Sequence, residues 1–243
     1  MKQGFFEIKA NNPIALNVYE MILSGEDSGI TSPGQFVNIK LQEQYLRRPI
    51  SVCDYDEKTI TLIYKVVGSG TEIMSKMKVG ESLDLLLGLG NGFSTDESGD
   101  TPVLIGGGVG VPPMFNLAKK LLSEGKNVSV ILGFNKEDEI FYKAEFEEIG
   151  AKVYVATADG SVGTKGFVTD VLKNLDYSYI YTCGPEPMLK AIYDISKTSG
   201  QFSFEERMGC GFGVCMGCSC KTKYGNKRIC IDGPVLVKEE IIW

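Results

Sequence analysis

Five of the seven cysteines lie between residues 210 and 230, and their spacing constrains the fold of this 243-residue chain more than any other feature. Cys210, Cys215 and Cys218 form a Cys-x4-Cys-x2-Cys pattern, and Cys230 follows at a distance. This spacing is typical of plant-type [2Fe–2S] sites, in which four thiolates hold two irons. The glycines between the cysteines would let backbone N–H groups approach the sulfurs. We therefore expect these four cysteines to be the metal ligands.

Two alternatives use the same segment differently. A zinc site would favour two paired Cys-x2-Cys units, and the segment contains one such pair. Cys220 is a spare cysteine that either packs behind the ligands or replaces Cys230 as the fourth of them. The segment from residue 204 to the end is too short to bury a core of its own, so a metal or a neighbouring domain must hold it.

The rest of the composition excludes several classes of chemistry. Because the chain has no histidine, it can form no Ser-His-Asp triad and no His-ligated metal site. Its net charge of −6 argues against nucleic acid as a partner. The first residues lack the pattern of a signal peptide, and no apolar run is long enough to span a membrane. We expect a cytoplasmic protein with reduced thiols and no membrane association.

Alternating apolar and polar residues characterise the first part of the chain, from residue 1 to about 98. Residues 35–41 and 59–66 are two examples, and Gly, Pro and Asn residues separate such runs. A period of two residues with frequent turns predicts an antiparallel sheet or barrel.

In residues 99–203, short apolar runs alternate with stretches of helical spacing. Strands are predicted over 103–105, 128–132, 152–156 and 179–182, and helices over 114–122, 143–149, 168–175 and 188–196. This alternation predicts an α/β domain with a parallel sheet and crossover helices. The chain is therefore expected to be multi-domain, with parts 1–98, 99–203 and 204–243.

A glycine-rich turn, GGGVGVPP over residues 106–113, joins the first strand of the predicted α/β domain to its first helix. Glycines let the backbone approach a diphosphate, and the helix N-terminus offers free N–H groups. The match to G-x-G-x-x-G is incomplete because Val111 takes the sixth position, so a turn without a ligand is the alternative. Small-residue turns after three later strands would lie on the same edge of the sheet. The candidate nucleotide-binding residues are Gly107, Gly108, Gly110, Cys183 and Gly184.

Two stretches in the barrel-like part also suit a phosphate. Residues 47–51, RRPIS, precede an alternating strand, and an Arg and a Ser three residues apart can face one diphosphate. Residues 68–71, GSGT, follow a strand and open a short helix, which makes another turn able to bind an anion. A solvated basic turn is the alternative for residues 47–51.

In this order the motifs resemble the ferredoxin reductase superfamily, in which a flavin-binding barrel precedes a nicotinamide-binding domain. A closer resemblance, over nearly the whole chain, is to the electron-transfer subunits of type B dihydroorotate dehydrogenases. It rests on LRRPIS (46–51), GGGVGVPP (106–113), YTCGP (181–185), ERMGCGFGVC (206–215) and CIDGPV (230–235).

The resemblance implies an FAD-binding antiparallel β-barrel domain (1–98), an NAD-binding α/β domain (99–203) and a [2Fe–2S] cluster module (204–243). It implies FAD contacts from Arg48, Pro49, Ile50, Ser51, Ile63, Tyr64, Lys65, Gly70 and Thr71. It also implies that the four ligands are Cys210, Cys215, Cys218 and Cys230, with NAD(H) as co-substrate.

The implied function is that of an oxidoreductase subunit in pyrimidine biosynthesis. Its partner would be an FMN-containing catalytic subunit that oxidises dihydroorotate to orotate, and the two would form a heterotetramer. Electrons would pass from that FMN through the cluster and FAD to NAD⁺. No side chain of this chain is then expected to act as a nucleophile or general base, and the chain alone should show NADH diaphorase activity.

Two other functions are kept as alternatives. One is an electron-transfer subunit of another NAD(P)-dependent complex, of the sulfide dehydrogenase or ferredoxin–NADP reductase type. The other is a non-catalytic redox sensor. The coenzyme also stays open, because residues 132–135 lack the acidic residue expected for NAD, and Lys136 either contacts a 2′-phosphate or is solvated. Trp243 ends the cluster segment, and we expect it to pack on the surface.

Overall fold

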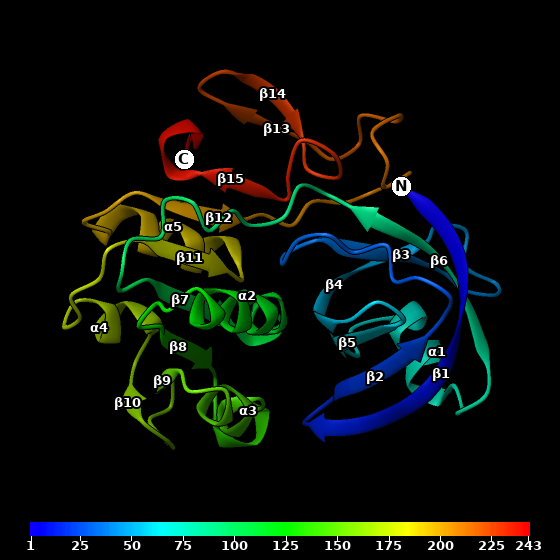
Figure 1. Cartoon of the computed structure of the whole chain (residues 1–243), viewed down its shortest axis with the longest axis horizontal. Helices are drawn as coiled ribbons and strands as arrows, with labels where there is room; N and C mark the ends of the chain where they lie inside the picture. Colours follow the sequence, from blue (N-terminus) through cyan, green and yellow to red (C-terminus); the bar gives the residue numbers. More distant parts are fainter.

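The N-terminal part is a closed antiparallel barrel of six strands, as its alternating pattern predicts (Figure 1). The computed structural model describes residues 1–243. The barrel elements are β1 (Lys2–Ala15), β2 (Val18–Ser24), β3 (Phe36–Lys40), β4 (Arg48–Tyr55), β5 (Thr59–Lys65), α1 (Ser69–Lys76) and β6 (Ser82–Leu89). Around the barrel the strands follow the order β1-β2-β5-β4-β3-β6. Ile60, Leu62 and Tyr64 alternate along β5 and fill the interior, as the two-residue period of a strand requires.

The second part is a seven-stranded sheet in the order β10-β9-β8-β7-β11-β12-β15. Its strands are β7 (Val103–Gly107), β8 (Ser129–Phe134), β9 (Lys152–Thr157), β10 (Thr164–Lys165), β11 (Ile180–Cys183), β12 (Gly200–Ser203) and β15 (Val235–Val237). All neighbouring strands are parallel except β15, which runs antiparallel to β12. The predicted parallel sheet is therefore confirmed.

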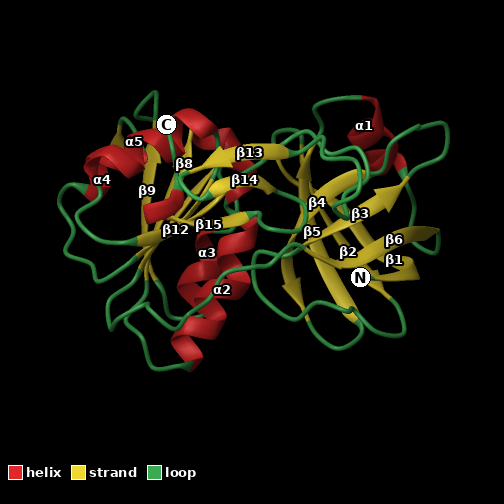
Figure 2. Ribbon diagram, turned by 90° about the horizontal axis from the view of Figure 1, so that it is seen from above, coloured by secondary structure: helices red, strands yellow, loops and turns green.

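Helices cover both faces of this sheet (Figure 2). They are α2 (Pro112–Ser123), α3 (Lys143–Glu148), α4 (Val168–Leu172) and α5 (Glu186–Ile195), with short 3-10 turns η1 (Gly108–Gly110), η2 (Glu137–Glu139) and η3 (Lys238–Glu240). Along β7, Leu104 packs in the cluster with α2, whereas Val103 and Ile105 pack in the cluster with α4 and α5. A strand buried on both sides explains why the sequence shows a continuous apolar run there.

The C-terminal segment is held by its neighbours, as its small size requires. After β12 the chain runs over the barrel side of the molecule, forms the hairpin of β13 (Ser219–Thr222) and β14 (Gly225–Arg228), and returns to the sheet through β15 (Figure 1). Phe202 of β12 faces Leu236 of β15 in the ladder. Cys218, Ile229 and Cys230 are buried in the same apolar cluster as the sheet residues. The segment therefore shares a core with the α/β part.

The structure corrects the sequence analysis at one point. Residues 48–51 do not precede an alternating strand; they are the first residues of that strand, β4. Pro49 is the second residue of β4, and proline is tolerated mainly at strand starts and edges, so the alternating pattern becomes visible only after it. The strands β10, β12 and β15 were not predicted, since each has at most four residues and too short a pattern to detect.

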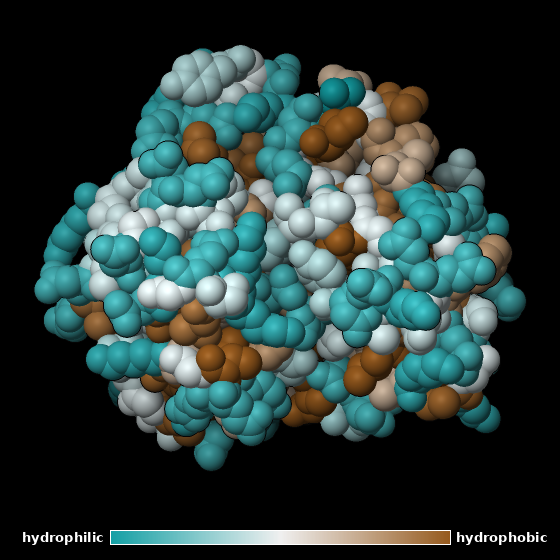
Figure 3. Space-filling view, viewed as in Figure 1, coloured by the Kyte–Doolittle hydropathy of each residue, from teal (hydrophilic) through white to brown (hydrophobic).

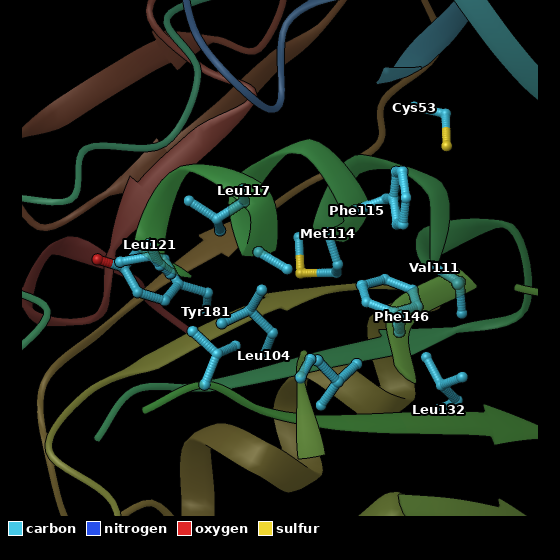
Figure 4. Packing of buried hydrophobic residues seen from close by; sticks show 14 of the residues in the cluster. Cys53, Leu104, Val111, Met114, Phe115, Leu117, Leu121, Leu132, Phe146 and Tyr181 are labelled. Carbon is cyan, nitrogen blue, oxygen red and sulfur yellow. The ribbon is translucent and has the colours of Figure 1, made fainter. Parts of the chain in front are cut away.

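The barrel and the α/β part share one apolar cluster. Figure 4 shows Phe115 of α2 between Cys53 of the barrel and the sheet. At the edge of this contact, Asp54 of β4 accepts hydrogen bonds from Asn116 at 2.6 Å and Lys119 at 2.7 Å, both on α2. The two parts therefore bury side chains against each other, and close packing of this kind holds them in one relative position.

Candidate functional site

The carboxyl ends of the central parallel strands align at one edge of the sheet. In register, Cys183 of β11 faces Gly106 of β7, and Gly107 faces Gly133 of β8. Phe134 then faces Thr157 at the end of β9. The small-residue turns that the sequence singled out therefore meet at this edge, where open α/β sheets bind ligands.

The glycine turn needs its glycines for two reasons. A Cβ on Gly110 would overlap the backbone carbonyl of Cys183, so the turn can pack against β11 only without a side chain. Gly108 has a φ of +52° and open space beyond it. One side of the turn is therefore closed against Cys183 and Gly184, and the other side, at the start of α2, is open to a ligand. The structure brings all five predicted nucleotide-binding residues together.

Cys183 behaves as a small apolar residue at this edge. Burial raises the pKa of its thiol to about 12, and the neighbouring Ser203 only partly offsets that effect. The thiol is thus protonated at neutral pH and is not a nucleophile. The geometry therefore gives Cys183 a packing role at this edge.

The ladder between β4 and β5 in the closed barrel is incomplete, and the gap in pairing, here called the opening, lies at the predicted flavin residues. The last pair in the β4–β5 ladder is Val52 with Leu62. Beyond it, residues 48–51 pair only with β3, and residues 63–65 pair only with β2. No ladder pair therefore joins these two backbone edges across the opening, and backbone groups that are not paired in a sheet need other partners when they are buried.

Arg48 and the start of α1 close one end of that opening. The Arg48 side chain lies against Gly70, where a Cβ would overlap its Nε atom. Its Nη1 atom donates to the Leu46 carbonyl at 2.6 Å. Thr71 Oγ1 accepts the Val67 N–H at 3.0 Å and donates to the Gly68 carbonyl at 3.1 Å, which fixes the turn. A guanidinium beside a helix N-terminus is an arrangement that suits a diphosphate.

Only the main chain of Tyr64 can line the opening. Its side chain is inside the barrel, where the hydroxyl donates to Asn11 Oδ1 at 2.8 Å. Burial raises the pKa of Tyr64 well above its usual value. Ile63 points into the shared core instead, and Lys65 pairs with Glu139 at 3.3 Å across the domain contact.

The four predicted ligand sulfurs lie as two pairs. The Cys210 and Cys215 N–H groups each donate to the other residue's Sγ at 3.4 Å, and the Cys230 N–H donates to Cys218 Sγ at 3.4 Å. No three ligating side chains of the chain converge as around a single metal ion. Two pairs suit a two-iron cluster with two protein ligands on each iron.

Backbone donors favour the thiolate form at one end of this loop. Partial burial opposes ionisation of Cys210, but backbone N–H groups, including those of Cys215 and Val214, lower its pKa to about 6. Burial and the adjacent Cys218 raise the pKa of Cys230 to about 12. Because the thiolate is the metal-binding form, Cys230 would lose its proton only as a metal binds.

Arg228 fixes the middle of the cysteine loop, a role that sequence reasoning missed. Its Nη1 atom donates to the Gly213 carbonyl at 2.7 Å, and its Nε atom donates to Asp232 at 3.2 Å. Gly213, with a φ of +88°, in turn donates its N–H to Cys230 Sγ at 3.1 Å. The only signal in the sequence was a basic residue close to a candidate ligand.

Asn38 and Asn91 of the barrel part also contact the segment and were missed. Asn38 Nδ2 donates to the Cys210 carbonyl at 3.3 Å. Asn91 Nδ2 donates to the Val235 carbonyl at 2.8 Å, and its Oδ1 accepts the Val235 N–H at 3.1 Å. No pattern in the sequence distinguishes these asparagines from those in ordinary turns.

Cys220 lies apart from the sulfur pairs. It is in β13, in register with Lys227 of β14, and burial raises the pKa of its thiol. Cys230, by contrast, both donates to Cys218 and accepts from Gly213. These contacts favour Cys230 over Cys220 as the fourth ligand.

A hollow of about 710 Å³ lies where the three parts meet. Arg48 and Pro49 line it from the barrel, Gly184 from the sheet edge, and Cys220 and Trp243 from the C-terminal segment. Its wall therefore joins the barrel opening, the nucleotide edge and the cysteine segment in one place.

The sequence predicts that Trp243 only packs on the surface, and the structure gives it a further place in the wall of the hollow. It packs against Phe204 and Tyr193, with ring centroids 5.6 and 6.0 Å away, while lining the hollow. Its buried Nε1 atom has no hydrogen-bond partner.

Two family models match the chain at the places just described. Residues 205–242 match the iron–sulfur cluster binding domain of dihydroorotate dehydrogenase B. Residues 104–194 match the oxidoreductase NAD-binding domain. No helix of the structure is long and apolar enough to cross a membrane.

Curated relatives match over the full length. The chain is 43% identical to the electron transfer subunit of dihydroorotate dehydrogenase B (NAD(+)) from Geobacillus sp. (strain WCH70), over 100% of the chain and 99% of the relative. The subunit of the same description from Fusobacterium nucleatum is 44% identical, over 96% of each chain.

A solved structure is also similar throughout. It is that of the NADH-dependent reduced ferredoxin–NADP oxidoreductase, described for flavin-based electron bifurcation. The match has a TM-score of 0.89 and 31% identity, and it covers 98% of this chain and 90% of that one.

Proposed function

The chain belongs to the electron transfer subunits of NAD⁺-dependent dihydroorotate dehydrogenase B, and we propose a role for each of its three parts on that basis. As a member of this family it is an oxidoreductase component with FAD, a [2Fe–2S] cluster and NAD(H) as its redox groups. The observation that carries the proposal is the single hollow where the barrel opening, the nucleotide edge and the cysteine segment meet.

The order of the redox groups follows from their chemistry. Nicotinamide exchanges two electrons as a hydride, whereas a [2Fe–2S] cluster transfers one electron at a time, and a flavin does both. The flavin therefore belongs between the other two. The chain's own contribution is to hold the three groups in this order.

The proposed FAD site is the opening between β4 and β5. Main-chain groups of residues 48–51 and 63–65 would bind the ring system, supported by the missing ladder pairs between these stretches. Arg48, Gly70 and Thr71 would bind the diphosphate, supported by the guanidinium beside the start of α1.

The proposed nicotinamide site is the edge formed by Gly107, Gly108, Gly110, Cys183 and Gly184. Support comes from the left-handed, uncovered Gly108 and from the close contact of Gly110 with Cys183. A diphosphate bound at the start of α2 would extend across the ends of the parallel strands.

The proposed cluster ligands are Cys210, Cys215, Cys218 and Cys230. Their two pairs and the N–H groups that point at their sulfurs support this assignment. The cluster would lie beside the barrel, because Asn38 of β3 contacts the Cys210 carbonyl.

The family implies a catalytic partner subunit, and we assign the tip of the cysteine loop as the surface that it covers. The exposed apolar side chains gathered there are Phe212, Val214, Met216 and Ile231. Figure 3 shows apolar atoms at the upper right, over the loop drawn in orange in Figure 1. An exposed apolar patch next to a redox centre suits a protein interface, because electrons must cross a short distance there. The partner would contain FMN, and two copies of each subunit would form a heterotetramer.

A cytoplasmic location fits the chemistry of the thiols. All seven cysteines are free, and four of them must stay reduced to bind iron. The net charge of −6 is the ground for expecting no nucleic-acid partner.

One alternative has a specific observation in its favour. The 31% identity to a ferredoxin–NADP oxidoreductase chain fits a subunit of another NAD(P)-dependent complex. The higher identity to dihydroorotate dehydrogenase subunits, 43% and 44%, favours the first function.

Enzyme assays of the separate subunits test the proposal. The chain alone should reduce artificial dyes with NADH and should not oxidise dihydroorotate. Addition of the catalytic subunit should couple dihydroorotate oxidation to NAD⁺ reduction. Dihydroorotate oxidation by the chain alone, or no coupling after the two subunits are combined, would refute the division of roles.

A further inference from the structure

Asn38 connects the barrel to the cysteine loop. Its neighbours Val37 and Ile39 point into the barrel core, so the Asn38 side chain points outward, yet it is only 1% exposed. The cysteine loop covers it, and Asn38 Nδ2 donates to the carbonyl of Cys210 at 3.3 Å. This hydrogen bond joins a β-barrel strand directly to a proposed cluster ligand.

The cysteine loop is shaped to admit this side chain. A Cβ on Gly211 would overlap Asn38 Nδ2, and Gly211 has a φ of +78°, which only glycine adopts readily. Gly211 therefore gives Asn38 access to the neighbouring carbonyl. The contact depends on one residue from each part of the chain.

The same asparagine is tied to the strand of the proposed FAD site. In the β3–β4 ladder Asn38 lies opposite Pro49. The Asn38 carbonyl also accepts a hydrogen bond from Arg47 Nη1 at 3.2 Å. Asn38 thus contacts both the cysteine loop and β4, the strand whose first residues line the proposed FAD site.

The Asn38 side chain does not maximise stability. Its Oδ1 atom is buried and has no hydrogen-bond partner. An unsatisfied buried polar atom of this kind lowers stability. The only hydrogen bond that the Asn38 side chain makes is therefore the one to the Cys210 carbonyl, which suits a role in positioning the loop.

We propose that Asn38 is a positioning residue that holds the Cys210 end of the cluster loop at a fixed place beside the flavin-facing strands. The inference rests on the proposed FAD and cluster sites. In this role Asn38 determines how fast single electrons pass between the two groups, and it leaves hydride transfer from NADH unchanged.

Asn38→Leu is the variant that tests this role. It removes the donor to the Cys210 carbonyl and keeps the number and branching of the side-chain heavy atoms. In the anaerobically purified holoprotein, amides 210–215 should exchange with deuterium several-fold faster than in the wild type. NADH should reduce the flavin at the wild-type rate and the cluster at least about tenfold more slowly. The thermal midpoint should change little, because removal of the unpaired Asn38 acceptor offsets the loss of the donor to the Cys210 carbonyl.

Two controls separate this role from a general effect. Asn12→Leu changes an exposed asparagine on β1 and should leave both rates unchanged. Asn38→Asp keeps the shape but replaces the donor with a second oxygen facing the Cys210 carbonyl, and it should slow cluster reduction as Asn38→Leu does.

The outcomes distinguish the inference from the proposed function. If the wild-type protein holds no flavin or no iron, the proposed function fails. If the wild type holds both, and Asn38→Leu matches its exchange and cluster-reduction rates, the positioning role alone is wrong. A loss of flavin reduction in Asn38→Leu would also overturn it, because the effect would then not be confined to the cluster.

Discussion

The glycine turn and the cysteine loop solve the same problem, holding a redox group in place, in opposite ways. The turn joins two regular elements, β7 and α2, and steric contact of its glycines with β11 fixes it. The cysteine loop belongs to no regular element. N–H···S hydrogen bonds and side chains from the barrel and from β14 fix it. A site on regular elements is ready before its ligand binds, whereas the loop depends on its contacts and on the metal.

Loss of a proposed ligand should give the largest effect and should separate the two regions. In Cys230→Ser we expect complete loss of cluster iron, because its sulfur completes the second pair and accepts the Gly213 N–H. NADH should still reduce the flavin, since the glycine turn is unaffected. Iron analysis and diaphorase assays measure the two properties.

The matched control for that variant is Cys220→Ser, which changes a cysteine outside both sulfur pairs. It should keep its iron. If Cys220→Ser lost the iron and Cys230→Ser kept it, the ligand assignment would be reversed.

A methyl group in the glycine turn should impair NADH binding and leave the cluster intact, the reverse of the effect of Cys230→Ser. In Gly110→Ala the new Cβ overlaps the Cys183 carbonyl, so the turn must move away from β11. We expect the KM for NADH to rise at least about tenfold and stability to fall by about 1–3 kcal/mol. The iron content and the cluster spectrum should stay at wild-type values.

Gly125→Ala is the control for backbone conformation alone. Gly125 also has a positive φ, +78°, but its Cβ would meet open space. This variant should lose some stability and keep the KM for NADH. Equal KM values for Gly110→Ala and the wild type would contradict the steric account.

A smaller effect is expected from the contact that ties the C-terminal segment to the barrel. Asn91→Ala leaves both the N–H and the carbonyl of Val235 without their side-chain partner. Unsatisfied groups of this kind cost about 1–3 kcal/mol each, so the segment should open more often. Hydrogen exchange should increase in residues 229–237 and stay unchanged in residues 103–123. Uniform acceleration in both regions would show global destabilisation instead.

The smallest expected effect concerns the coenzyme. Lys136 Nζ pairs with Asp138 at 2.9 Å, and Asp138 raises the pKa of Lys136, so the lysine is charged but already neutralised. In Asp138→Asn the ammonium becomes free for a 2′-phosphate, and kcat/KM for NADPH should rise a few-fold relative to NADH. High salt should diminish the gain, because both groups are exposed. If the ratio of kcat/KM for NADPH to that for NADH does not change, Lys136 does not lie near the 2′ position of the adenosine ribose.

The sequence predicted the regular region well and the irregular one only in part. Apolar periodicity located β7, α2 and the turn between them because each residue there interacts mainly with its neighbours in sequence. The spacing of Cys210, Cys215 and Cys218 predicted a cluster for the same local reason. Asn38 and Arg228 escaped notice because their role depends on contacts with Cys210 and Gly213, which only the folded chain brings together.

Tyr64 shows another limit of sequence reasoning. The motif predicts a flavin contact from Tyr64, but it does not indicate whether the side chain or the main chain of Tyr64 makes that contact. The structure does, because the register of β5 points the ring into the barrel beside Asn11. Trp243 is similar, since its place at the hollow depends on β15 joining the sheet.

An anaerobic titration of the purified chain with NADH, followed by absorbance and EPR, tests the central claim most directly. The account predicts a yellow-brown protein with FAD and about two irons per chain. NADH should bleach the flavin band, and the EPR signal of a reduced [2Fe–2S] cluster should then appear. A protein that contains zinc in place of iron, or a cluster that stays oxidised after NADH has reduced the flavin, would contradict it.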